Sequence, residues 1–264
     1  MKAPIFDPSW PQDIVALYKH DVQEIWDDRI AIHIWNQYQN QLSVYKSYTP
    51  SDTGLEILDV GCAQATLALQ LAEAGHRVSA VDLRQEFLDY AASRYEHGDI
   101  EFIQGNVLDL HIARRFDLIF ANQIVEHLVY PMEMLETLKK LLKAGGRLVV
   151  TTPNFHYLMS TLPSFTQLGD PRDWESRQFS ADGDGHFFAY QETELYRMFC
   201  RTGMEDVETQ FFESPWICGH MKLRYLHGTV PVGVLRKLDK FFLKLPVVGK
   251  VLAHQLLVTG VRPQ

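Results

Sequence analysis

Leu58-Asp59-Val60-Gly61-Cys62-Ala63-Gln64-Ala65 decides the fold of this chain, because an apolar strand gives way there to a turn of small residues. Asp82 follows Gly61 by 21 residues and closes the next apolar run, RVSAVD (77–82). Small residues let the main chain of such a turn approach a nucleotide-like ligand, and an acid at the tip of the second strand can accept hydrogen bonds from both ribose hydroxyls. The pair predicts a nucleotide-type cofactor at the carboxyl ends of two parallel strands.

Short apolar runs alternate with longer helical stretches around this turn, a pattern typical of βαβ units and a parallel sheet. Strands are predicted at 56–60, 77–82, 100–105, 116–122 and 147–154, and helices at 65–74, 85–96 and 131–143. Later in the chain a helix is predicted at 191–202, and strands at 205–213 and 253–262. This order of elements indicates an α/β fold.

Three segments lie outside the alternation. Residues 11–48 hold one or two helices rich in Trp, Tyr and His, and residues 155–190 form an irregular segment. Loops of that length are usually lids or binding loops. The stretch VGVLRKLDKFFLKL (232–245) predicts an amphipathic helix with a basic side. Its default role is to pack onto the domain, and contact with an anionic membrane or a lipid-like acceptor is the alternative.

Charge and cysteine content narrow the classes of function. Asp plus Glu number 33 against 25 for Lys plus Arg, a net charge of -8 that opposes non-specific attraction to nucleic acid. The three cysteines lie far apart and lack C-x-x-C spacing, which argues against a disulfide framework and a zinc site. The first residues lack the apolar run of a signal peptide. We therefore expect a cytoplasmic protein without a metal.

The turn also separates two kinds of cofactor. A dinucleotide fingerprint reads G-x-G-x-x-G and cradles a pyrophosphate, whereas here Ala63 and Ala65 follow Gly61. A cofactor without phosphates fits this turn better. A nucleotide-cofactor oxidoreductase is the alternative enzyme.

Residues 56–154 resemble the class I S-adenosylmethionine-dependent methyltransferases of the ubiquinone-biosynthesis-like branch. The motifs of that branch run D-x-G-C-G-x-G, then a strand-two acid, G-D-A and E-H-x-x-x-P; here they correspond to 59–65, Asp82, 105–107 and 126–131. The segment GDGHFFAYQETEL (183–195) also resembles the stretch before the penultimate helix of the branch. The resemblance implies S-adenosylmethionine as cofactor and methyl transfer to a hydroxyl or amine of a small-molecule acceptor.

The resemblance further implies a Rossmann-like seven-stranded sheet, mostly parallel, with helices on both faces and the last strand antiparallel. Residues 1–264 would form one domain. Its parts would be a helical cap (1–50), a cofactor-binding core (51–154), a lid (155–190) and a C-terminal part (191–264) with an amphipathic insertion (214–252).

Cofactor contacts are implied by the same resemblance. The methionine part would be faced by Asp59, Gly61, Cys62 and Ala63, and the ribose and adenine would be held by Asp82 and Leu83. The adenine would also be contacted by Asn106 and Val107. The pocket near the sulfonium would be closed by Asn122 and Gln123. The side-chain carbonyl of Asn106 would accept from the adenine amine.

Two parts of this set depart from the motifs of the branch. Ala63 and Ala65 replace glycines of the turn, and Asn106 replaces an aspartate. An alanine held at positive φ would be strained by about 1–2 kcal/mol, and its methyl would narrow the space for the cofactor. A catalytically weak S-adenosylmethionine-binding regulator is therefore the alternative that is not an enzyme.

His186 and His127 are the predicted catalytic residues. His186 lies in a glycine-flanked loop that we expect to fold over the pocket, and His127 follows a cofactor-side strand. Histidine has an unperturbed pKa near 6.5, so its neutral ring can take a proton from an attacking hydroxyl. We expect His186 to be the better base, because it can approach the acceptor from the side opposite the cofactor.

Overall fold

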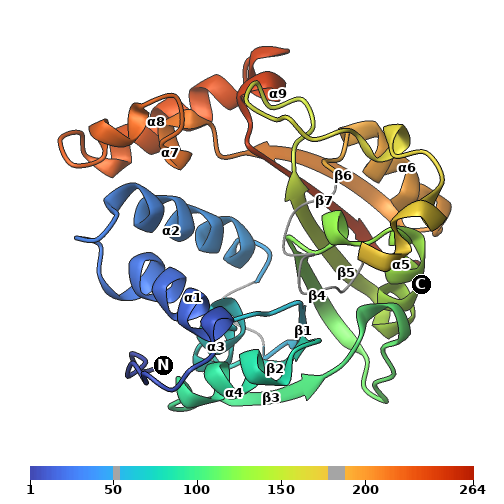
Figure 1. Ribbon diagram of the computed structural model, residues 1–264. Coiled ribbons are helices and arrows are strands. Elements are labelled where there is room, and N and C mark those ends of the chain that lie inside the picture. Colours follow the sequence, from blue (N-terminus) through green and yellow to red (C-terminus); the bar gives the residue numbers. More distant parts are fainter. Residues whose placement is uncertain (50–53, 178–187) are drawn as a thin grey trace.

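Seven strands form one sheet in the computed structural model, which describes residues 1–49, 54–177 and 188–264 (Figure 1). The strands are β1 (Glu56–Val60), β2 (Arg77–Asp82), β3 (Asp99–Gln104), β4 (Phe116–Asn122), β5 (Leu142–Pro153), β6 (Glu205–Phe212) and β7 (Gln255–Val261), in the spatial order β3-β2-β1-β4-β5-β7-β6. Strands β1 to β5 pair in parallel, and β7 is antiparallel to both of its neighbours. The predicted Rossmann-like sheet with an antiparallel last strand is confirmed.

The strand order reverses at β1, which pairs with β2 on one side and with β4 on the other. In open α/β sheets, ligands bind outside the carboxyl ends of the strands at such a reversal. The small-residue turn 61–65 follows β1 directly and therefore lies at the position where a ligand is expected.

Helices cover both faces of the sheet (Figure 1). One face carries α2 (Ile32–Lys46), α3 (Thr66–Glu73) and α4 (Gln85–Ser93), and the other carries α5 (Pro131–Leu141) and α6 (Glu192–Arg201). Side chains alternate along a strand, so Ile57 of β1 lies in the core beneath α2, α3 and α4, and Leu58 lies in the core beneath α5 and α6. This double burial explains why β1 has apolar residues at the consecutive positions Ile57 and Leu58.

The N-terminal cap consists of α1 (Gln12–Asp21), a π-helix (Val22–Trp26) and α2. Asp21 and Arg94 form an ion pair of 2.8 Å in which both side chains are fully buried. The hydroxyl of Tyr90, on α4, donates to the same carboxylate at 2.9 Å. Because a buried charge is costly unless it is paired and hydrogen-bonded, this pair fixes the cap against α4 and the turn.

The segment between β6 and β7 contains α7 (Pro215–Cys218), a 3₁₀ helix (Leu223–Leu226), α8 (Val232–Leu243) and α9 (Val248–Leu252), and it lies beside α2 (Figure 1). Asp239 of α8 is buried and accepts a hydrogen bond from the main-chain N–H of Ser214 at 2.7 Å. The amphipathic helix predicted at 232–245 is thus present as α8. Within the described ranges, no helix is long and apolar enough to cross a membrane.

Some boundaries differ from the sequence prediction. α5 ends at Leu141 rather than at residue 143, because Leu142 already pairs with Phe116 in the sheet. The irregular segment after β5 contains two short 3₁₀ helices that the sequence did not predict, and two more follow β3 and β4. These are Phe165–Gln167, Pro171–Arg177, Val107–Asp109 and Val125–His127.

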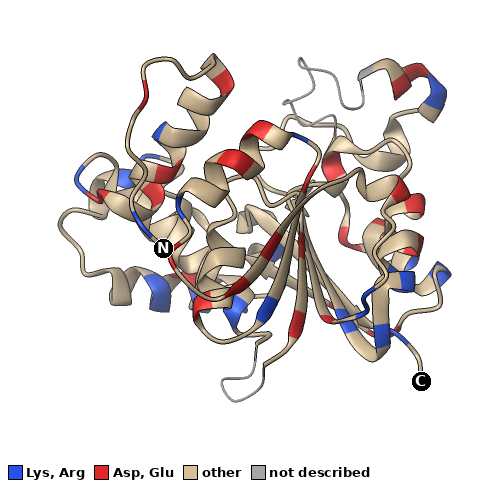
Figure 2. Cartoon of the chain, turned by 90° about the horizontal axis from the view of Figure 1, so that it is seen from below, with Lys and Arg blue, Asp and Glu red and all other residues tan. Residues whose placement is uncertain are grey.

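Part of the predicted lid lies outside the described residues. This part, 178–187, includes His186 and the first residues of the stretch 183–195. Over the described elements, acidic and basic residues are interspersed along the chain (Figure 2).

Candidate functional site

The turn after β1 has left-handed backbone at three positions. Gly61 has φ +67°, and a Cβ there would lie 2.9 Å from Cδ1 of Ile124, so only glycine fits without movement. Ala63 and Ala65 have φ values of 46° and 54°. A left-handed alanine costs about 1–2 kcal/mol, so surrounding contacts must hold the turn in this shape.

Residues of the N-terminal cap supply part of that support. The side chain of Gln64 donates to the Glu24 carboxylate at 3.0 Å. The buried Arg94 guanidinium donates to the main-chain carbonyl of Gln64 and, at 3.0 Å, to the hydroxyl of Thr66. The same guanidinium pairs with Asp21 of the cap. The cap and the turn are therefore one hydrogen-bonded unit.

Asp82, at the end of β2, faces this turn. Its Oδ2 accepts from the main-chain N–H of Ala63 at 2.9 Å, and its Oδ1 accepts from that of Arg84 at 3.0 Å. An ionised carboxylate has about four acceptor positions, so lone pairs remain for two hydroxyl groups. Leu83, beside it, is 41% exposed and offers apolar surface. This geometry fits the ribose and adenine of a nucleoside.

Asp59, on β1, and Cys62, in the turn that follows, are both buried. Burial, and then the neighbouring Asp82, raise the pKa of Asp59 to about 7. Burial also raises the pKa of Cys62 well above its usual value, so the thiol stays protonated at neutral pH. A protonated, buried thiol is a poor nucleophile, and Cys62 therefore serves as a small residue that lines the turn.

Asn106 has a structural task as well as the predicted one. Its side-chain oxygen accepts from the main-chain N–H of Leu108 at 3.0 Å and so caps the 3₁₀ helix after β3. The carbonyl oxygen keeps a second lone pair for another donor. Val107 is buried directly behind it.

Polar side chains gather where the carboxyl ends of β4 and β5 meet the amino end of the antiparallel strand β7. The hydroxyl of Thr151 donates to the Asn122 carbonyl at 3.1 Å, and the side-chain nitrogen of Gln123 lies 3.2 Å from that hydroxyl and 2.9 Å from Oε1 of Gln255. Glu126, in the next turn, is fully buried, and burial raises its pKa to about 8. This cluster lies at the end of β4, the strand that pairs with β1 at the reversal of the strand order.

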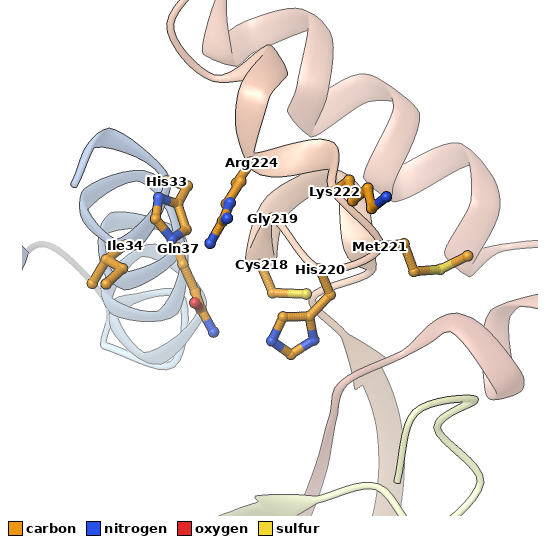
Figure 3. Close-up of a pocket in the computed structure, with 9 residues that line it drawn as sticks. All are labelled: His33, Ile34, Gln37, Cys218, Gly219, His220, Met221, Lys222 and Arg224. Atoms are coloured by element: carbon orange, nitrogen blue, oxygen red, sulfur yellow. The ribbon is translucent and has the colours of Figure 1, made fainter.

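A pocket of about 390 Å³ opens between α2 and the residues around α7 (Figure 3). His33 and Gln37 line it from α2, and Cys218, His220 and Arg224 line it from the other side. Nδ1 of His220 lies 2.7 Å from the hydroxyl of Tyr157. Burial, and then the nearby His254 and His33, lower the pKa of His220.

A chain of polar contacts joins this pocket to the cluster at the strand ends. Gln37 donates to the buried Glu213 at 3.0 Å, and Nδ1 of His254 lies 3.6 Å from that carboxylate. The side-chain nitrogen of Gln255 lies 3.2 Å from the same ring nitrogen of His254. Because Gln255 also contacts Gln123, the pocket and the end of β4 share one polar network.

The structure thus brings most of the predicted cofactor residues to one edge of the sheet. The turn residues Asp59, Gly61, Cys62 and Ala63 lie with Asp82 and Leu83, while the loops after β3 and β4 carry Asn106, Val107, Asn122 and Gln123. His127 ends the short 3₁₀ helix after β4 and is half-buried. His186 lies outside the described residues.

The residues of the pocket network are not among the predicted site residues; they are Gln37, Tyr157, Glu213, His220 and His254. One signal was available, because Glu213 follows β6 and His254 precedes β7. Adjacent antiparallel strands place such residues at the same edge, and the two are indeed joined by a main-chain hydrogen bond of 2.8 Å. The contacts of Gln37, Tyr157 and His220 depend on tertiary packing.

Comparisons with known proteins give the class of the chain. Residues 51–203 match the family model described as a methyltransferase domain. A ubiquinone biosynthesis O-methyltransferase of Caulobacter sp. (strain K31) is 30% identical over 167 residues, which are 56% of this chain and 66% of that protein. One from Coxiella burnetii (strain Dugway 5J108-111) is 32% identical over 108 residues, which are 39% of this chain and 46% of that protein. The chain thus spans about half to two thirds of these relatives.

Solved structures show the same fold. Magnesium protoporphyrin IX methyltransferase from Synechocystis PCC 6803, with bound SAH, aligns with a TM-score of 0.59 at 14% identity over 95% of each chain. Phosphoethanolamine N-methyltransferase 2 from Haemonchus contortus, in complex with S-adenosyl-L-methionine, aligns with a TM-score of 0.58 at 18% identity, over 97% of this chain and 62% of that one.

Fold, site and comparisons agree that the chain belongs to the methyltransferase domain family. This is the class I family that uses S-adenosylmethionine as methyl donor. The resemblance found in the sequence is thereby confirmed, and the oxidoreductase alternative is not favoured. The structure supplies the fit for this donor: a left-handed turn at the strand reversal and a strand-two carboxylate with spare acceptor positions.

Proposed function

We propose that this chain transfers a methyl group from S-adenosylmethionine to a hydroxyl of a small molecule held in the pocket between α2 and α7. One observation carries the proposal: the polar network that runs from Gln123, beside the cofactor turn, to Gln37 at the pocket. Relatives named O-methyltransferases favour a hydroxyl as the acceptor over an amine.

On the cofactor side, the chain mainly positions the donor. S-Adenosylmethionine supplies a methyl group on a sulfonium that leaves as a neutral thioether. Asp82 would accept from the ribose hydroxyls, Leu83 and Val107 would contact adenine, and the turn 61–65 would hold the methionine part. Aligning two reactants in this way can contribute roughly 7–11 kcal/mol. The division into cap, cofactor core, lid and C-terminal part belongs to the same proposal.

On the acceptor side, a histidine would take the hydroxyl proton. The sequence candidates His186 and His127 stay predictions, and the pocket adds His220. Its lowered pKa keeps the ring neutral at neutral pH, and its Nδ1 is held against Tyr157. A positioned general base typically contributes about 10²–10⁴-fold to the rate. We assign the proton transfer to His220.

A membrane contact is a second, separate proposal, carried by α8. The outer side of this helix exposes Val234, Lys237, Lys240, Phe241 and Lys244. Phe241 is 59% exposed, an unusual state for a phenylalanine, and lysines flank it. We infer that this side lies on an anionic bilayer, because burial of the apolar side chains and attraction of the lysines to anionic headgroups both favour binding. Vesicles with phosphatidylserine should co-sediment the chain, and Phe241→Ser should reduce the bound fraction; equal binding by both proteins would refute the contact.

The main proposal is tested by activity. Purified chain is incubated with S-adenosylmethionine and fractionated extracts of small metabolites, and S-adenosylhomocysteine is measured together with any product that is heavier by one methyl group. We expect both to appear in the same fractions and to vanish with Asp82→Ala. Binding of S-adenosylhomocysteine without turnover in any fraction would favour the regulator instead. Methylated amines without methylated hydroxyls would overturn the assignment of the acceptor.

A further inference from the structure

Arg224 gives the pocket a specific chemical character. Figure 3 shows its guanidinium directed into the space between His33 and Gln37 of α2 and Cys218 of α7. His220 lines the same pocket. Among the described residues that line this pocket, none carries a carboxylate.

The backbone brings Arg224 and His33 together. Gly219 lies between them at φ +72°, and a Cβ there would lie 3.1 Å from Cβ of Arg224 and 3.1 Å from Cδ2 of His33. The main-chain N–H of Arg224 donates to the carbonyl of Gly219 at 2.9 Å. Any larger residue at 219 would force these two side chains apart and strain the backbone.

The guanidinium is also held in place by its neighbour. Its Nη2 donates to the hydroxyl of Tyr225 at 3.0 Å, and the group lies 5.0 Å from the centre of that ring. In the described part of the chain, no carboxylate forms an ion pair with Arg224. Burial, and then Arg224, lower the pKa of His33. Arg224 thus brings into the pocket a positive charge with which no carboxylate of the described residues pairs, and the lowered pKa favours the neutral ring of His33.

We propose that this pocket binds an anionic group, a carboxylate or a phosphate, of the molecule whose hydroxyl is methylated. The inference rests on the proposed function and names the class of acceptor. A guanidinium presents its N–H groups in a planar fork that matches either anion with two parallel hydrogen bonds. His33 adds a third donor, and Gln37 can donate from the same side.

The pocket also orients such an acceptor. An anion at Arg224 would lie at the outer end, while His220 and the network through Gln37 and His254 lie toward the strand ends. The opposite end of a small acceptor would then point at Gln123 and the methyl donor. Anchoring the charged end therefore places a hydroxyl at the reacting end.

Lys222 provides a matched control. It lines the same pocket, but in Figure 3 its side chain is directed away from Arg224, His33 and Gln37. Lys222→Gln and Arg224→Gln each remove one positive charge. Only the second removes a donor that is aimed into the pocket.

The test uses the full chain saturated with S-adenosylhomocysteine, titrated calorimetrically with benzoate, phenyl phosphate and the neutral analogue benzamide. We expect at least one of the two anions to bind at least tenfold more tightly than benzamide, and its identity distinguishes a carboxylate from a phosphate. Arg224→Gln should abolish that preference, Arg224→Lys should restore part of it, and Lys222→Gln should change affinity by less than about threefold, since exposed charges away from the ligand are screened.

Equal affinity for benzamide and both anions, or an anion preference that survives Arg224→Gln, would overturn the inference. An equal loss with Lys222→Gln would also overturn it, because general charge rather than aimed donors would then attract the anion. These failures are distinct from failure of the proposed function. Failure of the proposed function would appear instead as absent binding of S-adenosylhomocysteine when the chain is saturated before any anion is added, or as binding without turnover in the activity assay.

Discussion

The proposed cofactor side and the proposed acceptor side of this molecule are built in opposite ways. Gly61 and Asp82, on the proposed cofactor side, lie close together in the sequence, and main-chain hydrogen bonds join the turn to the end of β2. Gln37 and Glu213, on the proposed acceptor side, are 176 positions apart and meet only through packed side chains. The first side is therefore specified by local motifs, whereas the second side can change its residues while the sheet stays the same.

Arg94→Ala should have the largest effect, because it breaks the link between the cap and the cofactor turn. The fully buried Asp21 would lose its partner, and removal of one partner from a buried pair costs about 3–5 kcal/mol. Urea unfolding should show a loss of that size. Arg115→Ala, at an exposed position, is the control and should stay within about 0.5 kcal/mol of the wild type. Equal stability of the two variants would show that the cap is not held by this pair.

His220→Gln should lower kcat by about 10²-fold while the affinity for S-adenosylhomocysteine changes by less than about threefold, because only the acceptor side is touched. The pH dependence of kcat shows in which protonation state the base is active. The base must be neutral, so the wild-type rate should fall as pH drops through a pKa below 6.5, and the variant should lack that limb.

Parallel variants His186→Gln and His127→Gln assign the base. A loss confined to His186→Gln would return that role to the sequence-based candidate. If no histidine variant lowers kcat, the reaction proceeds by alignment alone.

Asp82→Ala should weaken S-adenosylmethionine binding by at least tenfold and leave affinity for acceptor-side ligands intact. Hydrogen bonds to a charged group contribute about 1.5–3 kcal/mol, and tenfold corresponds to about 1.4. Calorimetry with the folded variant decides the matter. The variant must first show a normal unfolding transition, since Asp82 also accepts from Ala63 and Arg84.

The two alanines of the turn should give the smallest effects, and the two effects should differ in size. Ala63→Gly removes left-handed strain at a half-buried position and should stabilise the chain by up to about 1 kcal/mol and tighten the cofactor slightly. Ala65 is fully buried, so Ala65→Gly also loses roughly 0.8 kcal/mol of apolar burial and should be nearly neutral. Thermal unfolding separates the two. Loss of cofactor binding in either variant would show that the methyl is a required contact.

The sequence predicts the proposed cofactor side of the molecule better than the proposed acceptor side. All seven strands were predictable, as was the gathering of most of the predicted cofactor residues at one edge of the sheet, because double burial and small-residue turns leave local patterns. The end of α5 was not, since pairing of Leu142 with Phe116 ends the helix at Leu141, before the predicted end at residue 143. Nor was the pocket predictable, because Gln37 and His220 acquire meaning only when α2 packs beside α7.

The capping role of Asn106 and the support of the turn by Arg94 show the same limit in smaller form. The sequence alone does not distinguish a side chain that caps its own loop from one that binds a ligand. The buried Arg94, which follows a helix, also looks like a surface arginine in the sequence, because its partner Asp21 is distant along the chain.

Calorimetric titration of the purified chain with S-adenosylhomocysteine, and separately with NAD, tests most directly that the turn and Asp82 hold a sulfonium cofactor. We predict one S-adenosylhomocysteine bound per chain, at least tenfold weaker binding with Asp82→Ala, and no measurable heat from NAD. Binding of NAD, or S-adenosylhomocysteine affinity that Asp82→Ala leaves unchanged, would contradict the assignment of this edge of the sheet as the cofactor site.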